Sequence, residues 1–169
     1  SWRSSGRAEG RRSPSWPSSL RACWFWAEVR RGRLRLHASQ TIAGYWLPER
    51  LARFHAAYPT VDLDIHVGNT SDVAQAVLDG GCEIGFVEGA TDHDCLERLE
   101  VGQDRLLILC HPAHPWAGRA SLAATDLSGA AWIMREAGSG TRSSLEAALS
   151  EAGCDPSALR VSLVLPSNE

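Results

Sequence analysis

The chain has 169 residues, of which 44% are hydrophobic and 22% are charged, the balance of a globular protein with one or two small domains. No run of 18 or more uncharged apolar residues occurs, so an ordinary transmembrane helix is excluded. The formal net charge is −3, and all 17 basic residues are arginine.

The chain consists of two segments with opposite net charge. Residues 1–31 carry seven arginines against two acids, a net charge of +5, whereas residues 32–169 carry ten arginines against 18 acids, a net charge of −8. Four of the seven tryptophans also lie in the first 26 residues. Residues 1–30 lack the apolar run of a signal peptide, and no helix or strand period is visible before about residue 20.

Two interpretations of this leader remain open. It is either a basic arm that contacts nucleic-acid phosphates and stacks tryptophans on bases, or a disordered or non-native segment. We favour the second, because nothing in residues 1–30 resembles a nucleic-acid-binding module. The absence of lysine fits a GC-rich gene, and a frameshifted start in such a gene would give this composition.

From residue 33 onward the hydrophobic pattern is regular. The alternation of apolar and polar residues from Val61 to Val67 is the clearest strand signal, and apolar spacings of three to five after Thr41 indicate an amphipathic helix that stops at Tyr58-Pro59. Expected strands cover residues 34–36, 61–67, 84–87, 99–101, 106–110, 131–134 and 161–165. Expected helices cover about residues 42–58, 70–79 and 141–152. Strands that alternate with helices predict an α/β sheet with right-handed crossovers.

Polar residues follow several of these strands and begin the next helix. Helix N-termini carry unpaired N–H groups and favour anions, and ligands of open α/β sheets bind at the carboxyl ends of strands. These residues therefore predict a cleft for a small molecule. The alternative is that the hydroxyls only cap their helices. The residues concerned are Ser39, Gln40, Thr41, Asn69, Thr70, Ser139, Gly140, Thr141 and Ser167.

The sequence gives little indication of nucleotide binding, catalysis or metal binding. The segment 138–142 lacks the lysine and the spacing of a nucleotide-triphosphate loop, and no Ser/His/Asp arrangement is legible, so no enzyme is predicted. Five cysteines without a C-x-x-C pair indicate reduced thiols in a cytoplasmic protein. Cys110, His111 and His114 are a candidate metal cluster, but a proline follows each histidine and no fourth ligand is near. We expect neither a metal nor a cofactor.

Four segments together resemble the effector-binding domain of LysR-type transcriptional regulators. They are GRLRLHASQTIAGYWLPERLARFHAAYPTVDLDIHVGNTSDVAQAVLDGGCEIGFVEG, DRLLILCHPAHPWA, AAWIMREAGSGTR and VSLVLPSNE, and they span about residues 30–169 in order.

The resemblance implies a periplasmic-binding-protein-like (type 2) fold with two α/β subdomains, here residues 31–110 and 111–169, the second incomplete. It implies a small, often anionic effector in the cleft between the subdomains, with Ser39, Thr41, Asn69, Thr70 and the later hydroxyl positions as contacts. Family members associate through these domains into homo-oligomers. They are not enzymes, do not bind membranes, and act on DNA through a separate helix-turn-helix domain.

No counterpart of that helix-turn-helix is visible in residues 1–26, so we do not expect this polypeptide to bind DNA specifically. Three other functions remain as alternatives. A solute-binding module of the same fold would need a signal peptide or lipid anchor. An enzyme on this fold would need a catalytic residue in the cleft. A nucleic-acid binder would depend on the basic leader.

Overall fold

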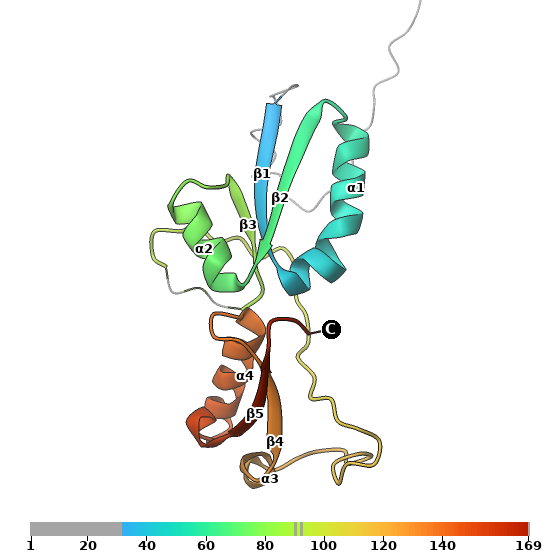
Figure 1. Ribbon diagram of the computed structural model, residues 1–169, viewed down its shortest axis with the longest axis vertical. Helices are drawn as coiled ribbons and strands as arrows, with labels where there is room; N and C mark the ends of the chain where they lie inside the picture. The colour runs from blue at the N-terminus through green and yellow to red at the C-terminus, as the bar shows by residue number, and fades with distance from the viewer. Residues whose placement is uncertain (1–31, 90, 92, 169) are drawn as a thin grey trace, which may run out of the picture.

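The computed structural model describes residues 32–89, 91 and 93–168. The predicted leader, residues 1–30, lies outside the described residues. Two parallel sheets form two lobes that are stacked end to end (Figure 1). We call the part built on the first sheet lobe I and the part built on the second sheet lobe II. The subdomain boundary between residues 110 and 111 stays a prediction.

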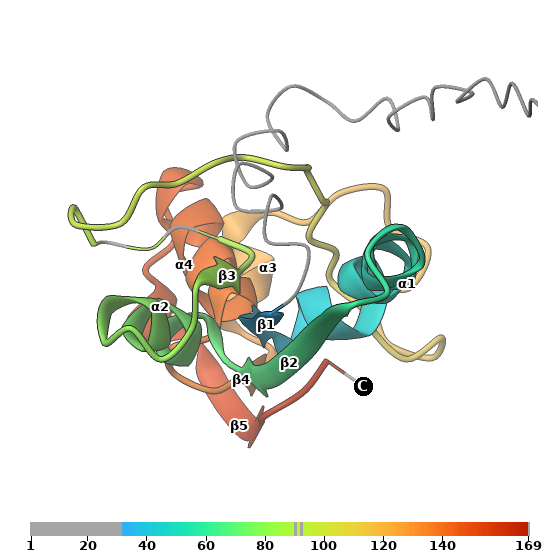
Figure 2. The ribbon, with the colours of Figure 1, turned by 90° about the horizontal axis from the view of Figure 1, so that it is seen from above.

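Lobe I is a three-stranded sheet with one helix layer on each face. β1 (Gly32–Ser39) lies between β2 (Val61–Gly68) and β3 (Ile84–Phe86), and both pairings are parallel. The central strand buries Leu36 and Ala38, as expected for a strand covered on both faces. α1 and α2 lie on opposite sides of this sheet, which Figures 1 and 2 show from two directions.

The helices of lobe I begin and end where the sequence predicts. A helical stretch starts directly after β1 and comprises a π-helical turn, η3 (Ile42–Trp46), and α1 (Leu47–Ala57), with Pro48 in the first turn of α1. α2 (Thr70–Leu78) begins at a capping box between Asn69 and Asp72. In this box the Asp72 N–H donates to Asn69 Oδ1 at 2.9 Å, and the Asn69 N–H donates to Asp72 Oδ2 at 3.1 Å.

Lobe II pairs β4 (Ala131–Arg135) with β5 (Arg160–Leu165) in parallel, and α4 (Gly140–Glu151) connects them. Two short elements were not predicted, α3 (Ala124–Ser128) and the 3-10 turn η4 (Pro156–Ala158). One apolar cluster forms the core of the lobe, and inside it the Trp132 indole N–H donates to the Leu127 carbonyl at 2.9 Å. The buried members are Leu127, Trp132, Met134, Leu149, Cys154 and Leu159.

The predicted strands at 99–101 and 106–110 are wrong. Residues 97–111 have no regular secondary structure, and Leu107 and Leu109 are 60% and 87% exposed. In Figure 1 this part of the chain descends from lobe I along lobe II toward α3. An apolar run becomes a strand only when another strand supplies the opposing hydrogen bonds, and no strand of the described residues pairs with this segment.

Candidate functional site

The carboxyl ends of both sheets meet at the junction between the lobes. β1 and β2 end there from lobe I, and β5 ends there from lobe II, with the last described residues lying beside the junction (Figure 1). α2 and α4 begin at the same place, so their N-termini are brought together. The polar residues predicted from the sequence follow these strand ends, and the fold gathers them at one junction.

Glycines let the two backbones approach closely at this junction. Gly89 and Gly138 have φ values of +77° and +87°, which side-chain-bearing residues rarely adopt. A Cβ on Gly140 would overlap the Glu88 carbonyl oxygen and lie 2.6 Å from Thr70 Oγ1. The Gly140 N–H instead donates to Thr70 Oγ1 at 3.0 Å, so the first residue of α4 is bonded directly to lobe I.

A hydrogen bond between two backbone groups also crosses the junction, since the Ser71 N–H donates to the Gly138 carbonyl at 3.1 Å. The Thr70 hydroxyl also donates to the Glu88 carbonyl at 3.2 Å, within lobe I. Thr70 is 4% exposed, so these bonds are shielded from water. We call this set of close contacts around Thr70, Gly138 and Gly140 the seam.

The Glu88 carboxylate lies at the seam between hydroxyls of both lobes. One carboxylate oxygen accepts from Ser39 Oγ at the end of β1, and the other accepts from Thr141 Oγ1 in the first turn of α4 at 3.2 Å. Ser39 is 1% exposed and Glu88 is half-buried. Among the ion pairs of the described residues, none involves Glu88.

Asn168 makes a second side-chain connection between the lobes. Its amide nitrogen donates to Thr41 Oγ1 at 2.9 Å, and Thr141 Oγ1 lies 3.5 Å away. The buried Arg135 guanidinium donates to the Asn168 amide oxygen at 3.2 Å and so orients the amide. Arg135 also pairs with Glu136 at 2.8 Å, and this guanidinium holds the pKa of the Glu136 carboxyl below its usual value.

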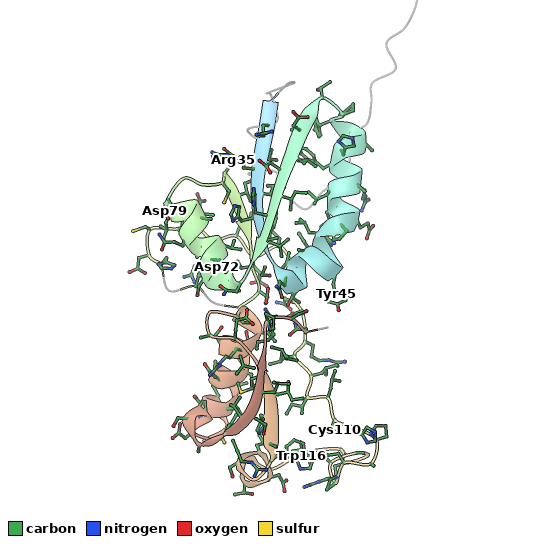
Figure 3. The ribbon with its side chains drawn as sticks, in the orientation of Figure 1. Arg35, Tyr45, Asp72, Asp79, Cys110 and Trp116 are labelled. Carbon is green, nitrogen blue, oxygen red and sulfur yellow. The ribbon has the colours of Figure 1, made fainter. Side chains whose placement is uncertain are left out.

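Two hollows flank the seam. The Thr41 hollow has a volume of about 340 Å³ and the Ser139 hollow about 390 Å³. The Thr41 hollow is lined by Gln40, Thr41, Ala43, Gly44, Tyr45, Val67, Ser167 and Asn168. The Ser139 hollow is lined by Thr70, Ser71, Ala74, Thr91, His93, Ala137, Gly138, Ser139, Arg142, Ser143 and Glu146. Figure 3 places Tyr45 beside the junction at the first turns of the η3–α1 stretch.

Each hollow is lined by a residue that has a buried polar atom without a partner. Gln40 Oε1 and Ser139 Oγ have no hydrogen-bond partner among the described residues, although Gln40 and Ser139 line the two hollows. An unsatisfied buried polar atom costs free energy unless a ligand or water completes it. Gln40 Oε1 needs a donor, and the Ser139 hydroxyl can donate or accept.

The capping alternative is correct for some of the predicted residues. Asn69 caps α2, and Ser39 Oγ accepts the Ile42 N–H at 3.4 Å. Ser139 precedes α4 but makes no side-chain cap bond. The predicted residues are therefore divided between caps, the seam and the two hollows, and their role as effector contacts stays a prediction.

Sequence reasoning missed Glu88 and Asn168. Glu88 is a polar residue that follows β3, and polar residues that follow the other strands were selected as candidate ligand contacts, so the same criterion would have selected Glu88. Asn168 is adjacent to Ser167, but its role depends on Arg135 and Thr41, which are 33 and 127 residues away in the chain. No local sequence pattern indicates those contacts.

The candidate metal cluster has other roles in the structure. His111 Nδ1 accepts the Ala113 N–H at 3.1 Å and His114 Nδ1 accepts the Trp116 N–H at 3.2 Å, both local turn bonds. Cys110 is exposed in the same loop, which Figure 3 shows beside lobe II. Within residues 32–89, 91 and 93–168, no group of three or more His, Cys, Asp or Glu side chains is placed to hold a metal ion. No helix in that part of the chain has the length and apolarity needed to cross a membrane.

Comparison with known proteins identifies relatives over about three quarters of the chain. The chain is 39% identical over 129 residues to the HTH-type transcriptional regulator CysL of Bacillus subtilis (strain 168), which covers 76% of this chain and 43% of CysL. This chain therefore spans less than half the length of that regulator.

Solved structures give the fold. The regulatory domain of Synechocystis PCC6803 CcmR, determined in complex with 2-PG, matches with a TM-score of 0.63 and 27% identity over 82% of this chain and 64% of that chain. The effector-binding domain of QuiR, in complex with shikimate, matches with a TM-score of 0.71 over 82% of this chain and 66% of that one, but at 15% identity it supports the fold alone. Both agree with the predicted periplasmic-binding-protein-like type 2 fold.

The family model described as "LysR substrate binding domain" matches residues 27–169, which includes every described helix and strand. The chain belongs to the LysR substrate-binding domain family.

Proposed function

We propose that this chain senses a small anionic metabolite at the junction between its lobes and transmits the binding event to a DNA-binding domain of the same regulator. The observation that carries the proposal is the pair of hollows at the seam, which are lined from both lobes by residues with hydroxyl and amide groups. A ligand bound there would contact both lobes at once and stabilise one arrangement of them.

The chemistry of the lining supports an anion that also carries hydroxyl groups. Thr41 and Ser139 each line one hollow and carry a hydroxyl. The N-terminus of α4, which has no acidic residue in its own first turn, borders the Ser139 hollow. Gln40 also lines the Thr41 hollow, and a side-chain amide can donate to or accept from a ligand hydroxyl. The CcmR regulatory domain, which shares 27% identity with this chain, was determined in complex with 2-PG.

The proposal extends to the intact regulator. The relatives are named as transcriptional regulators, and no catalytic family is indicated. We infer that the protein is not an enzyme, acts in the cytoplasm, and associates with further copies through its effector domains. Control of transcription would follow if the effector changes how the lobes or subunits are arranged and so repositions the DNA-binding domain.

A melting experiment tests the proposal. A panel of small carboxylates and phosphorylated acids, 2-PG included, is screened for a rise in the melting temperature of the chain, because a ligand that binds only the folded state stabilises it. At least one member should raise the melting temperature. Thr41→Val and Ser139→Ala each remove one hydroxyl, so whichever variant loses the shift identifies the hollow that is occupied.

Thr125→Val is the matched control, because Thr125 is an exposed hydroxyl-bearing residue in α3. It should keep the full ligand-induced shift. A stabilising acid whose effect is equal in wild type, Thr41→Val and Ser139→Ala would show that the hollows are not its site. A chain that no member of the panel stabilises would contradict an anionic effector of this size.

A further inference from the structure

We propose that the Glu88 carboxylate is an internal occupant of an anion subsite formed by Ser39 and Thr141, which holds the lobes together until an effector anion takes those two hydroxyls from it. Ser39, Glu88 and Thr141 lie at the seam and line neither hollow, so this inference adds a subsite to the proposed site. Its last step rests on the proposed function, but the occupancy of the subsite by Glu88 does not require an effector.

The first observation is that Glu88 accepts hydrogen bonds from both lobes at once. Ser39 belongs to the end of β1 and Thr141 to the first turn of α4, and each donates its hydroxyl to a different carboxylate oxygen. This is the two-sided recognition expected for the carboxylate of a bound ligand. Here the carboxylate is supplied by the chain itself, from the residue two positions after β3.

The second observation concerns charge. Among the described residues no cation pairs with Glu88, although six arginine–carboxylate pairs form there. The half-buried Glu88 charge is balanced by hydroxyl dipoles and by the positive end of α4. α4 has no acid in its own first turn, so Glu88 supplies from lobe I the negative charge that a helix N-terminus favours.

The consequence is competition between Glu88 and an anionic ligand. Two carboxylates cannot share Ser39 and Thr141, because like charges a few ångströms apart repel and the hydroxyls have one proton each to donate. An effector anion that binds here must therefore displace the Glu88 side chain. That displacement breaks the Glu88–Thr141 connection between the lobes and puts the ligand in its place, so binding and lobe arrangement are coupled.

Chemical rescue tests this directly. Glu88→Ala removes the internal carboxylate, and amide hydrogen exchange in the first turn of α4 should rise by about tenfold or more, since hydrogen bonds to charged groups are among the stronger ones. Excess sodium acetate should restore the slow exchange in Glu88→Ala by refilling the subsite, whereas sodium chloride at the same concentration should not. Wild-type exchange should be unaffected by acetate.

Glu151→Ala is the control, because Glu151 is an exposed glutamate at the other end of α4. It should leave exchange in the first turn of α4 unchanged. Glu88→Gln keeps the side-chain shape without the charge and serves if Glu88→Ala fails to fold. It should bind 2-PG about tenfold more tightly than wild type, because the repelling charge is gone.

Each outcome decides between the two claims. No rise in exchange in Glu88→Ala, or equal effects of acetate and chloride, overturns the internal-occupant proposal. Equal or weaker binding of 2-PG by Glu88→Gln overturns the competition step and leaves the proposed function standing. Acetate rescue without binding of any acid of the panel supports the occupant and contradicts the proposed function.

Discussion

Gly140→Ala should separate the lobes without unfolding either of them. Gly140 is the first residue of α4, and its Cα lies against the Glu88 backbone of lobe I. An added Cβ would lie 2.6 Å from Thr70 Oγ1 and 2.8 Å from the Glu88 carbonyl carbon, whereas ordinary contact begins at 3.4 Å. The Cβ would also overlap the Glu88 carbonyl oxygen, and every obstructing atom belongs to backbone or to a buried side chain, so the lobes must move apart to make room.

The cost of overpacking sets the magnitude. Overpacking of this kind costs about 1–3 kcal/mol. Alanine in place of glycine favours the helix by up to about 1 kcal/mol, but α4 keeps that gain whether the lobes are in contact or separated. The full loss therefore falls on the contact between the lobes, and about 1–3 kcal/mol corresponds to a change of about 5–150-fold in the population of separated lobes.

The Ser71 amide reports this separation, because it donates to the Gly138 carbonyl across the junction. Its hydrogen exchange, followed by nuclear magnetic resonance, should accelerate by that factor in Gly140→Ala while amides in the middle of α4 stay protected. Gly129→Ala is the control, since a Cβ there would meet its nearest atom at 3.9 Å. Unchanged Ser71 exchange in a folded Gly140→Ala protein would refute the close approach at the seam.

Three further predictions concern stability and reactivity. The buried arginine beside Glu136 lowers the pKa of that carboxyl, so the stability it contributes is present above about pH 4.5 and is lost as the pH falls through the lower folded-state pKa. Urea unfolding of Glu136→Gln should therefore depend less on acid than that of wild type, and an equal dependence would argue against this pair. Trp132→Phe removes the indole donor of the Leu127 carbonyl, which also accepts the Ala130 N–H at 3.4 Å, and should cost about 0.5–1.5 kcal/mol in urea unfolding, so a neutral result would contradict that bond. Burial raises the pKa of the Cys82 thiol, so iodoacetamide should modify the exposed Cys95 about tenfold or more faster than Cys82 in native protein, as read by peptide mass spectrometry; equal rates would show that Cys82 is accessible.

Local periodicity was enough to predict the elements whose signals lie entirely within the element itself. β2 alternates through its whole length, and α2 has its cap, its apolar stripe and its terminating glycines within a dozen residues. The predicted strand at 106–110 has an equally clear apolar run but no pairing partner among the described residues. Apolar composition shows that a segment can be buried, whereas pairing depends on a second segment that the pattern does not reveal.

The candidate site likewise combines features that the local sequence predicts with features that depend on distant segments. The residues after the strand ends could be selected from the sequence, because parallel strands bring their carboxyl ends to one edge. The partners of those residues could not, since Asn168 meets Thr41 and Glu88 meets Thr141 only after both lobes have formed. The approach of Gly140 to Glu88 likewise depends on how the lobes sit together. Contacts between lobes arise from tertiary packing, which no window of a few residues contains.

Mapping a bound acid by nuclear magnetic resonance shows whether the ligand lies between the lobes. Titration of the chain with 2-PG, or with whichever acid of the panel stabilises it, should then shift amide signals on both sides of the seam. The affected groups should be residues 39–41 and 88–89 from lobe I and residues 139–142 from lobe II. Shifts confined to one lobe, or an acid that binds with these signals unchanged, would contradict a site built from both lobes.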